Sequence, residues 1–271
     1  MLNFTHEKIT DQVIRITDPL GVFMYLVIGD EKAALIDTGY GFGDLKGYVE
    51  SLTDKPLTVI LTHGHLDHAN GCAPFKEVYM SALDLPVYEK HSSQEFLKPL
   101  KENAGFKDLP YPQVRKEFKD LKDKQLFDLG NYQLEAISVP GHTPGMTMIL
   151  FKKDRMMLFG DGCGPGTILL EDWSSKVKDY KQSLINLKQY DGQYDRIIRN
   201  HGTGESKLEL LKNVTELCDL ILEGKDDHEL VDVSHMIETD KYKSYNAKKK
   251  DKNGNRADGK EGNITYREDK A

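Results

Sequence analysis

Four short apolar stretches of the chain are each followed at once by a glycine-containing loop that carries histidine or aspartate. The clearest is LTVIL at 57–61, which leads into THGHLDHANG at 62–71. The others lead into or contain VPGHTPG at 139–145, LFGDGCG at 158–164 and IIRNHG at 197–202. Apolar runs of this length are typical of buried strands, and glycine bends the chain after them. We therefore expect a sheet fold with polar side chains gathered on the loops at its strand ends.

The rest of the chain alternates β-rich and helical stretches twice. The predicted elements are short strands at 12–17, 22–28, 32–36, 57–61 and 77–80, four more between 125 and 159, one at 195–199, and helices at 44–53, 174–190 and 206–223. Residues 81–122 are predicted to form a mostly helical insertion that is rich in lysine and broken by prolines. This order favours an α/β fold in which two sheets pack together with helices outside.

The composition favours a globular protein with a well-solvated surface. Hydrophobic residues make up 38% of the chain and charged residues 30%, and no apolar run is long enough to span a membrane. The first residues, MLNFTHEKITDQV, do not resemble a secretory leader. The three cysteines, Cys72, Cys163 and Cys218, are odd in number and widely spaced, which indicates reduced thiols. A cytoplasmic location is therefore expected.

Charge divides the chain into an acidic body and a basic end. Residues 239–271 hold ten Lys/Arg against six Asp/Glu, a net charge of +4, so residues 1–238 carry −11 of the total of −7. We predict one domain over 1–238 and a basic C-terminal tail over 239–271. The lysines and glycines of the tail are typical of a disordered segment, and 263–266 is the part of it most able to dock. The acidic body disfavours a nucleic-acid substrate and favours a small molecule. The oligomeric state is left open.

Seven candidate metal ligands lie on the four loops. They are His63, His65, Asp67, His68, His142, Asp161 and His201. Five imidazoles and two carboxylates are enough for two divalent ions with positions left for water and substrate. This donor set suits zinc, with iron or manganese as alternatives. Cys163 is a further possible ligand, although a small buried side chain is the more frequent role of such a cysteine. The other four histidines are expected to be surface or hydrogen-bonding residues: His6, His91, His228 and His235.

The run from Thr62 to His68, followed in order by His142, Asp161 and His201, resembles the metallo-β-lactamase superfamily of metallo-hydrolases. The stretch YLVIGDEKAALIDTG at 25–39 resembles the second and third strands of that family, and the resemblance covers roughly residues 10–225. It implies a four-layer αββα sandwich. It also implies that His63, His65 and His142 bind one metal ion, that Asp67, His68 and His201 bind the other, and that Asp161 bridges them. Asp37 is either a turn residue or, as the family pattern implies, a carboxylate behind the metals that hydrogen-bonds a ligand loop.

The expected activity is hydrolysis by metal-bound hydroxide. Two divalent ions would bring the pKa of a bridging water to about 7, and the hydroxide would attack a carbonyl carbon. Asp67 is the expected catalytic residue, since its carboxylate can orient the hydroxide and carry a proton to the leaving group. There is no Gly-x-Ser-x-Gly elbow that would supply a serine nucleophile.

We therefore predict a metal-dependent hydrolase, with a dinuclear zinc centre, that cleaves an ester, thioester or lactone of a small molecule. The alternative is a phosphodiesterase or nuclease of the same superfamily, for which the basic insertion and tail would be the binding surface. A non-catalytic member is disfavoured because every ligand position is filled. In the favoured interpretation, the insertion and the tail form the wall that selects the substrate.

Overall fold

The computed structural model describes residues 3–233 and 242–271. The chain forms two compact units. Unit 1 consists of Met1–Ile137 and Ile149–Asp154, and unit 2 of Ser138–Met148 and Arg155–Ala271. The domain boundary predicted at 238/239 lies outside the described residues, as does His235.

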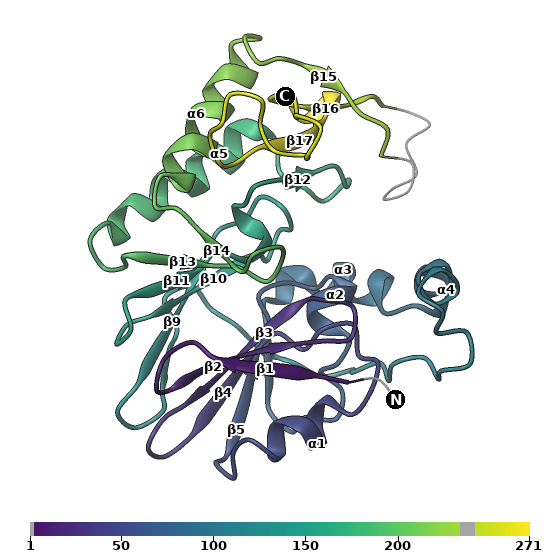
Figure 1. Cartoon of the computed structure of the whole chain (residues 1–271), viewed down its shortest axis with the longest axis vertical. Helices are drawn as coiled ribbons and strands as arrows, with labels where there is room; N and C mark the ends of the chain where they lie inside the picture. The colour runs from purple at the N-terminus through teal and green to yellow at the C-terminus, as the bar shows by residue number, and fades with distance from the viewer. Residues whose placement is uncertain (1–2, 234–241) are drawn as a thin grey trace. The chain divides into compact units, whose positions relative to one another are not determined.

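Unit 1 is built on a seven-stranded sheet (Figure 1). Its strands lie side by side in chain order, and their bounds are β1 Thr5–Lys8, β2 Val13–Thr17, β3 Phe23–Ile28, β4 Ala33–Ile36, β5 Leu57–Ile60, β6 Val78–Met80 and β7 Lys119–Asp120. The first four strands run antiparallel, whereas β4 to β7 run parallel. Ile36 of β4 and Ile60 of β5 are partners, so Asp37 and Leu61 leave the sheet at the same edge.

The helices of unit 1 lie between these strands in the chain. Their bounds are α1 Leu45–Glu50, α2 Leu66–Ala69, the 3-10 turn η1 Ala82–Asp84, α3 Leu85–His91 and α4 Gln94–Asn103. Strand β8 Leu126–Asp128 also belongs to unit 1, and the unit bounds fall within β9 Gln133–Ser138 and β10 Thr147–Phe151. The insertion is helical only as far as Asn103, and 104–122 contains no helix, so the prediction of a mostly helical 81–122 is right for the first half and wrong for the second. Leu26, Leu35, Val59 and Leu61 are fully buried in the core of the unit. This packing fixes the strand ends from which the polar loops leave.

Unit 2 contains two groups of strands and a helix pair. The first strands are β11 Met156–Leu158, β13 Arg196–Ile198 and β14 Glu205–Ser206, and the turn η2 Gly160–Gly162 follows β11. The four-stranded sheet has the order β12 Thr167–Leu169, β17 Ile264–Arg267, β16 Ser244–Asn246 and β15 Glu229–Leu230. The helices are α5 Val177–Asn186, continued by η3 Leu187–Tyr190, and α6 Leu210–Leu222, and the turn η4 Glu268–Lys270 follows β17. Helix α5 packs beside α6 (Figure 1).

The last thirty residues are more ordered than their composition indicates. Strand β17 lies between β12 and β16, parallel to the first and antiparallel to the second. This position confirms the prediction that 263–266 is a docking segment. None of the three cysteines forms a disulfide, and the cytoplasmic location stays a prediction. Within 3–233 and 242–271, no helix has the length and apolar character needed to cross a membrane.

Candidate metal centre

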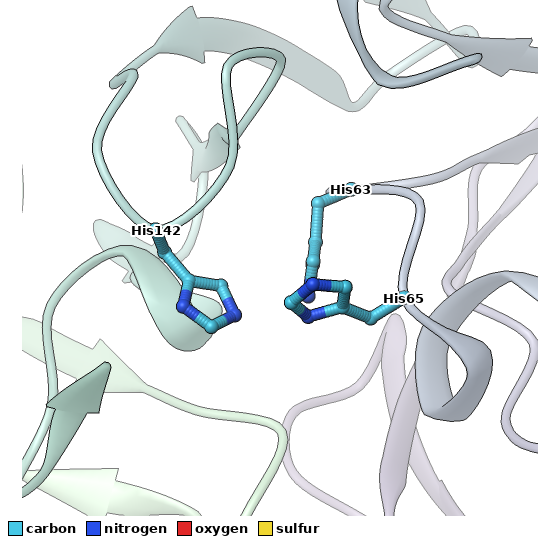
Figure 2. A group of neighbouring side chains, drawn as sticks. All are labelled: His63, His65 and His142. Atoms are coloured by element: carbon cyan, nitrogen blue, oxygen red, sulfur yellow. The ribbon is translucent and has the colours of Figure 1, made fainter. Parts of the chain in front are cut away.

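The loop after β5 carries four of the candidate ligands in unit 1. His63 and His65 lie on this loop with adjacent rings, whose centroids are 4.6 Å apart, and Figure 2 draws both of them. Helix α2 begins directly after His65, so it presents Asp67 and His68 in its first turns. The His68 ring lies 4.1 Å from that of His63, and its Nε2 is 3.5 Å from an Asp67 oxygen. The structure therefore brings the four predicted ligands of unit 1 together.

A buried carboxylate, Asp37, orients this loop. Asp37 has φ 61°, a left-handed conformation that aspartate tolerates better than most residues. Its Oδ1 accepts a hydrogen bond from the Thr62 backbone N–H at 2.7 Å, and its Oδ2 lies 2.8 Å from Nδ1 of His68. A carboxylate can only accept here, so Nδ1 of His68 carries a proton, and the neutral ring has its lone pair on Nε2. This arrangement is typical of histidines that bind a metal ion.

The same carboxylate acts on His63 through the Thr62 hydroxyl. That hydroxyl donates its one proton to the Asp37 carboxylate, at 2.8 Å from Oδ2. Its oxygen, 3.1 Å from Nδ1 of His63, must therefore accept from that ring nitrogen. His63, like His68, is left with the lone pair on Nε2.

Two residues of the insertion support the loop and were missed from the sequence. Asp84 is fully buried, and its Oδ2 accepts a hydrogen bond from the Gly64 N–H at 2.8 Å. A Cβ at Gly64 would lie 2.8 Å from the backbone oxygen of Asp84, so only glycine fits between the two histidines. An aspartate in front of a helix that begins Leu-Pro resembles an N-cap. That signal marks Asp84 as structural and says nothing of Gly64.

His91 is the second missed residue. Its ring stacks on that of His65, with centroids 4.4 Å apart and an interplanar angle of 12°, and Phe96 stacks on it at 4.1 Å. The Asn70 amide donates to the His91 backbone oxygen at 3.2 Å. His91 is buried, so it is a packing partner of a candidate ligand rather than a surface residue.

The remaining three candidate ligands lie in unit 2. Strands β11 and β13 are parallel and in register at Leu158 and Ile198, so the loops after them leave the same edge. Those loops place Oδ1 of Asp161 3.3 Å from Nε2 of His201. Oδ2 of Asp161 lies 3.8 Å from Nε2 of His142. One carboxylate thus lies beside two imidazoles.

His142 is held by a backbone carbonyl. It stands on the loop between β9 and β10 (Figure 2), and its Nδ1 lies 2.8 Å from the Ile168 backbone oxygen. Because a carbonyl can only accept, Nδ1 of His142 carries a proton, and the neutral ring has its lone pair on Nε2. A carbonyl performs here the role that Asp37 performs for His68.

Cys163 and two tyrosines of the C-terminal tail each have structural contacts. Cys163 is fully buried and contacts the Tyr180 hydroxyl, and burial raises the pKa of its thiol far above the usual range. Tyr245 stacks on His228 at 3.6 Å. The Arg267 guanidinium lies over the Tyr242 ring.

A sequence model described as the metallo-beta-lactamase superfamily matches residues 17–194. The chain belongs to this superfamily. The match includes six of the seven candidate ligands, and only His201 lies beyond it. The chain is therefore a metal-dependent hydrolase of the metallo-β-lactamase superfamily, as predicted.

Relatives of this chain include proteins named as a thioesterase and as a probable zinc-dependent hydrolase. Acyl-coenzyme A thioesterase MBLAC2 of Homo sapiens is 29% identical over 205 residues, which cover 66% of this chain and 72% of the relative. The probable polyketide biosynthesis zinc-dependent hydrolase PksB of Bacillus subtilis is 23% identical over 198 residues, covering 71% of this chain and 78% of the relative.

Solved structures are similar to this superfamily member at the level of the fold. A metallo-beta-lactamase from Cronobacter sakazakii has a TM-score of 0.59 and 20% identity, covering 82% of this chain and 96% of that one. A metallo-beta-lactamase from Pontibacter korlensis has a TM-score of 0.57 and 18% identity, covering 80% of this chain and 99% of that one. The predicted α/β class and metallo-β-lactamase fold are confirmed.

Proposed function

We propose that this chain is a dinuclear zinc hydrolase that cleaves a thioester of a small molecule, with esters and lactones as related substrates. The observation that carries the proposal is the orientation of three candidate ligands. His63, His68 and His142 each have Nδ1 tied to a hydrogen-bond acceptor, which leaves Nε2 to bind a metal ion.

The ligands divide into two sets. In the proposal, one ion is held by His63, His65 and His142, and the other by Asp67, His68, Asp161 and His201; each set has the donors that a metal ion needs. Asp161 would contribute a donor to both sets, because one of its oxygens lies near His142 and the other near His201. Imidazole and carboxylate donors without thiolate suit zinc. The name of PksB as a zinc-dependent hydrolase also supports this metal.

The side chains of the loop after β5 then perform the chemistry that the bound ions make possible. When bound, two divalent ions supply Lewis acidity and a water that ionises near neutral pH. Asp67 is partly exposed, with 16% of its side chain accessible, so its carboxylate can contact substrate and water. It accepts the proton of the attacking water and delivers it to the leaving group. Asp37 is fully buried and holds the His68 ring while the proton moves.

Two observations favour a substrate with an acyl group, and the first of them favours a thioester. The relative from Homo sapiens is named an acyl-coenzyme A thioesterase. In unit 1, residues 109–113 of the insertion line a cleft of about 820 Å³ whose wall includes Phe42, Tyr48 and Tyr111. An aromatic and largely apolar wall suits an acyl group better than a phosphodiester. The cleft supports the expectation that the insertion selects the substrate.

A substrate panel with metal-reconstituted protein tests the proposal. We expect close to two zinc equivalents by elemental analysis, and turnover of acyl-coenzyme A, p-nitrophenyl ester or lactone that a chelator abolishes and zinc restores. Bis-p-nitrophenyl phosphate is the comparison substrate at the same metal loading. A preparation that cleaves the phosphodiester well and no carboxylic substrate would show the phosphodiesterase alternative to be right. Zinc content near zero after reconstitution would contradict both.

A further inference from the structure

The loop that carries His142 rests on residues 167–175, which we call the support segment. Three hydrogen bonds join them. Nδ1 of His142 donates to the Ile168 oxygen at 2.8 Å, and the Ser174 hydroxyl donates to the His142 backbone oxygen at 3.0 Å. The Ser175 N–H donates to the Gly141 oxygen at 2.8 Å. Both the ring and the backbone of His142 are therefore positioned by the support segment.

The C-terminal strand β17 fastens one end of the support segment. Strand β12, the first part of the segment, pairs in parallel with β17, and Ile168 is the partner of Thr265. The Thr167 N–H donates to the Asn263 oxygen at 2.9 Å. The carbonyl that orients His142 thus belongs to a strand whose sheet neighbour lies almost a hundred residues further along the chain.

Lys270 fastens the other end. Its ammonium donates to the Ser174 backbone oxygen at 2.7 Å and to the Asp172 backbone oxygen at 3.0 Å. Lys270 is only 6% exposed, so these carbonyls replace the water that its ammonium has lost. Arg267 adds an ion pair to the Asp172 side chain at 2.8 Å. The ammonium holds the turn in which the Ser174 hydroxyl is aimed at His142.

We propose that Ser174 and Lys270 are positioning residues for the metal ligand His142, and that the end of the chain is part of the metal centre's support. This inference rests on the proposed function, in which His142 binds one of two zinc ions. A ligand must be held within about 0.5 Å and 10–20° of its binding geometry. Loss of a group that orients a ligand typically lowers metal affinity about 10–100-fold.

Zinc titration of single variants against a chromophoric chelator is the first test. Ser174→Ala and Lys270→Met should weaken one zinc equivalent about 10–100-fold and leave the other within about twofold. Ser174→Thr, which keeps the hydroxyl, should bind as the unmodified chain does. Matched controls are Ser183→Ala, whose hydroxyl donates to a carbonyl of its own helix, and Lys252→Met, an exposed lysine of the same region. The cobalt(II) absorption spectrum should change in Ser174→Ala and not in the controls.

A double-mutant cycle separates positioning from general destabilisation. In the His142→Ala background, Ser174→Ala should have no further effect on zinc affinity, because the side chain that it positions is gone. An unmodified chain that binds two zinc ions while Ser174→Ala binds them equally well overturns the inference alone. A Ser174 effect that persists without His142 also overturns it. An unmodified chain that binds no zinc overturns the proposed function. If Lys270→Met does not fold, the Ser174 variants decide.

Discussion

The candidate ligands of unit 1 and those of unit 2 are held in different ways. In unit 1, four ligands lie within the six positions 63–68, and one buried carboxylate, Asp37, orients two of them through side-chain hydrogen bonds. In unit 2, three ligands stand on three loops between 142 and 201, and a backbone carbonyl orients His142. That carbonyl is in turn held by the last strand of the chain.

This difference predicts how the candidate ligands of each unit respond to substitution. The loop after β5 is compact, and Asp37 alone orients two of its ligands. Removal of Asp37 should therefore disturb several ligands together. A dispersed set with separate supports loses its ligands one at a time. Asp67, the proposed catalytic residue, belongs to unit 1, as do the orienting carboxylate Asp37 and the tightly packed Gly64. The largest effects of substitution are therefore expected in unit 1.

The largest effect is expected for Asp67. Asp67→Ala removes the group proposed to move the proton, so kcat should fall about 10²–10⁴-fold at saturating zinc. The unit 2 variant Asp161→Asn should lose activity mainly through weaker zinc binding, which excess zinc partly restores. Steady-state kinetics on an acyl-coenzyme A, with zinc content measured in each sample, compare the two. Full rescue of Asp67→Ala by zinc would show that this residue is a ligand and nothing more.

The next largest effect is expected for Asp37, which orients the loop after β5. Asp37→Ala should lower the affinity for both zinc equivalents about 10–100-fold, because Asp37 orients His68 directly and His63 through Thr62. Ser174→Ala, in contrast, should weaken only one equivalent. Competitive zinc titration of the two variants measures the contrast, and Asp11→Ala, an exposed aspartate of unit 1, is the control. If Asp37→Ala lowers the affinity of only one zinc equivalent, Asp37 does not orient ligands of both.

The same contrast explains what could be predicted from the sequence. The ligands His63 to His68 are adjacent in the chain, and the apolar run at 57–61 places them at a strand end. For Asp37 the sequence allows two interpretations, a turn residue or a carboxylate that hydrogen-bonds a ligand loop. It cannot decide between them because nothing local shows that β4 and β5 are neighbours. Parallel pairing in register makes them so, and the Asp37 contacts then follow.

Other supports could not be predicted because they depend on long-range register. Asp84 reaches Gly64 across twenty positions, and β17 reaches β12 across almost a hundred. The strands β12 and β14 to β16 have only two or three residues each, too short for an apolar alternation to be recognised. The charge and glycines of the tail are typical of disorder. Its order comes from the pairing of β17 with β12 and β16, which composition does not reveal.

A third prediction compares the space around two loop glycines. Gly64→Ala places a Cβ 2.8 Å from the Asp84 backbone oxygen and 2.9 Å from the Tyr88 backbone nitrogen. Both are backbone atoms, so the main chain itself must shift to make room. We expect the free energy of unfolding to fall by about 1–3 kcal/mol. Gly166→Ala in unit 2 meets nothing within 4 Å and should be neutral or stabilising by up to about 1 kcal/mol. Urea unfolding of the metal-free variants gives both values, and equal costs would contradict the difference in packing.

The smallest effect on the metal centre is expected for Cys163, which follows Asp161 by two positions. Cys163 is in neither of the two groups of side chains that could hold a metal ion, and its fully buried side chain contacts the Tyr180 hydroxyl instead. Cys163→Ala should therefore keep the zinc content and both affinities within about twofold of the unmodified chain, as competitive titration would show. A lost zinc equivalent would make Cys163 a ligand.

The raised pKa of the Cys163 thiol has a sign that can be tested separately. Above about pH 9 the thiol ionises in the unfolded chain while it stays protonated in the folded one, so the unfolded state is favoured as pH rises. One such thiol costs up to roughly 1.4 kcal/mol of unfolding free energy per pH unit. Cys163→Ala removes this contribution, so the stability difference between unmodified chain and variant should shift in favour of the variant between about pH 8 and about pH 10. Urea unfolding at the two pH values measures it. A difference that does not change with pH would mean that the folded thiol ionises as readily as the unfolded one, and would return Cys163 to the set of possible ligands.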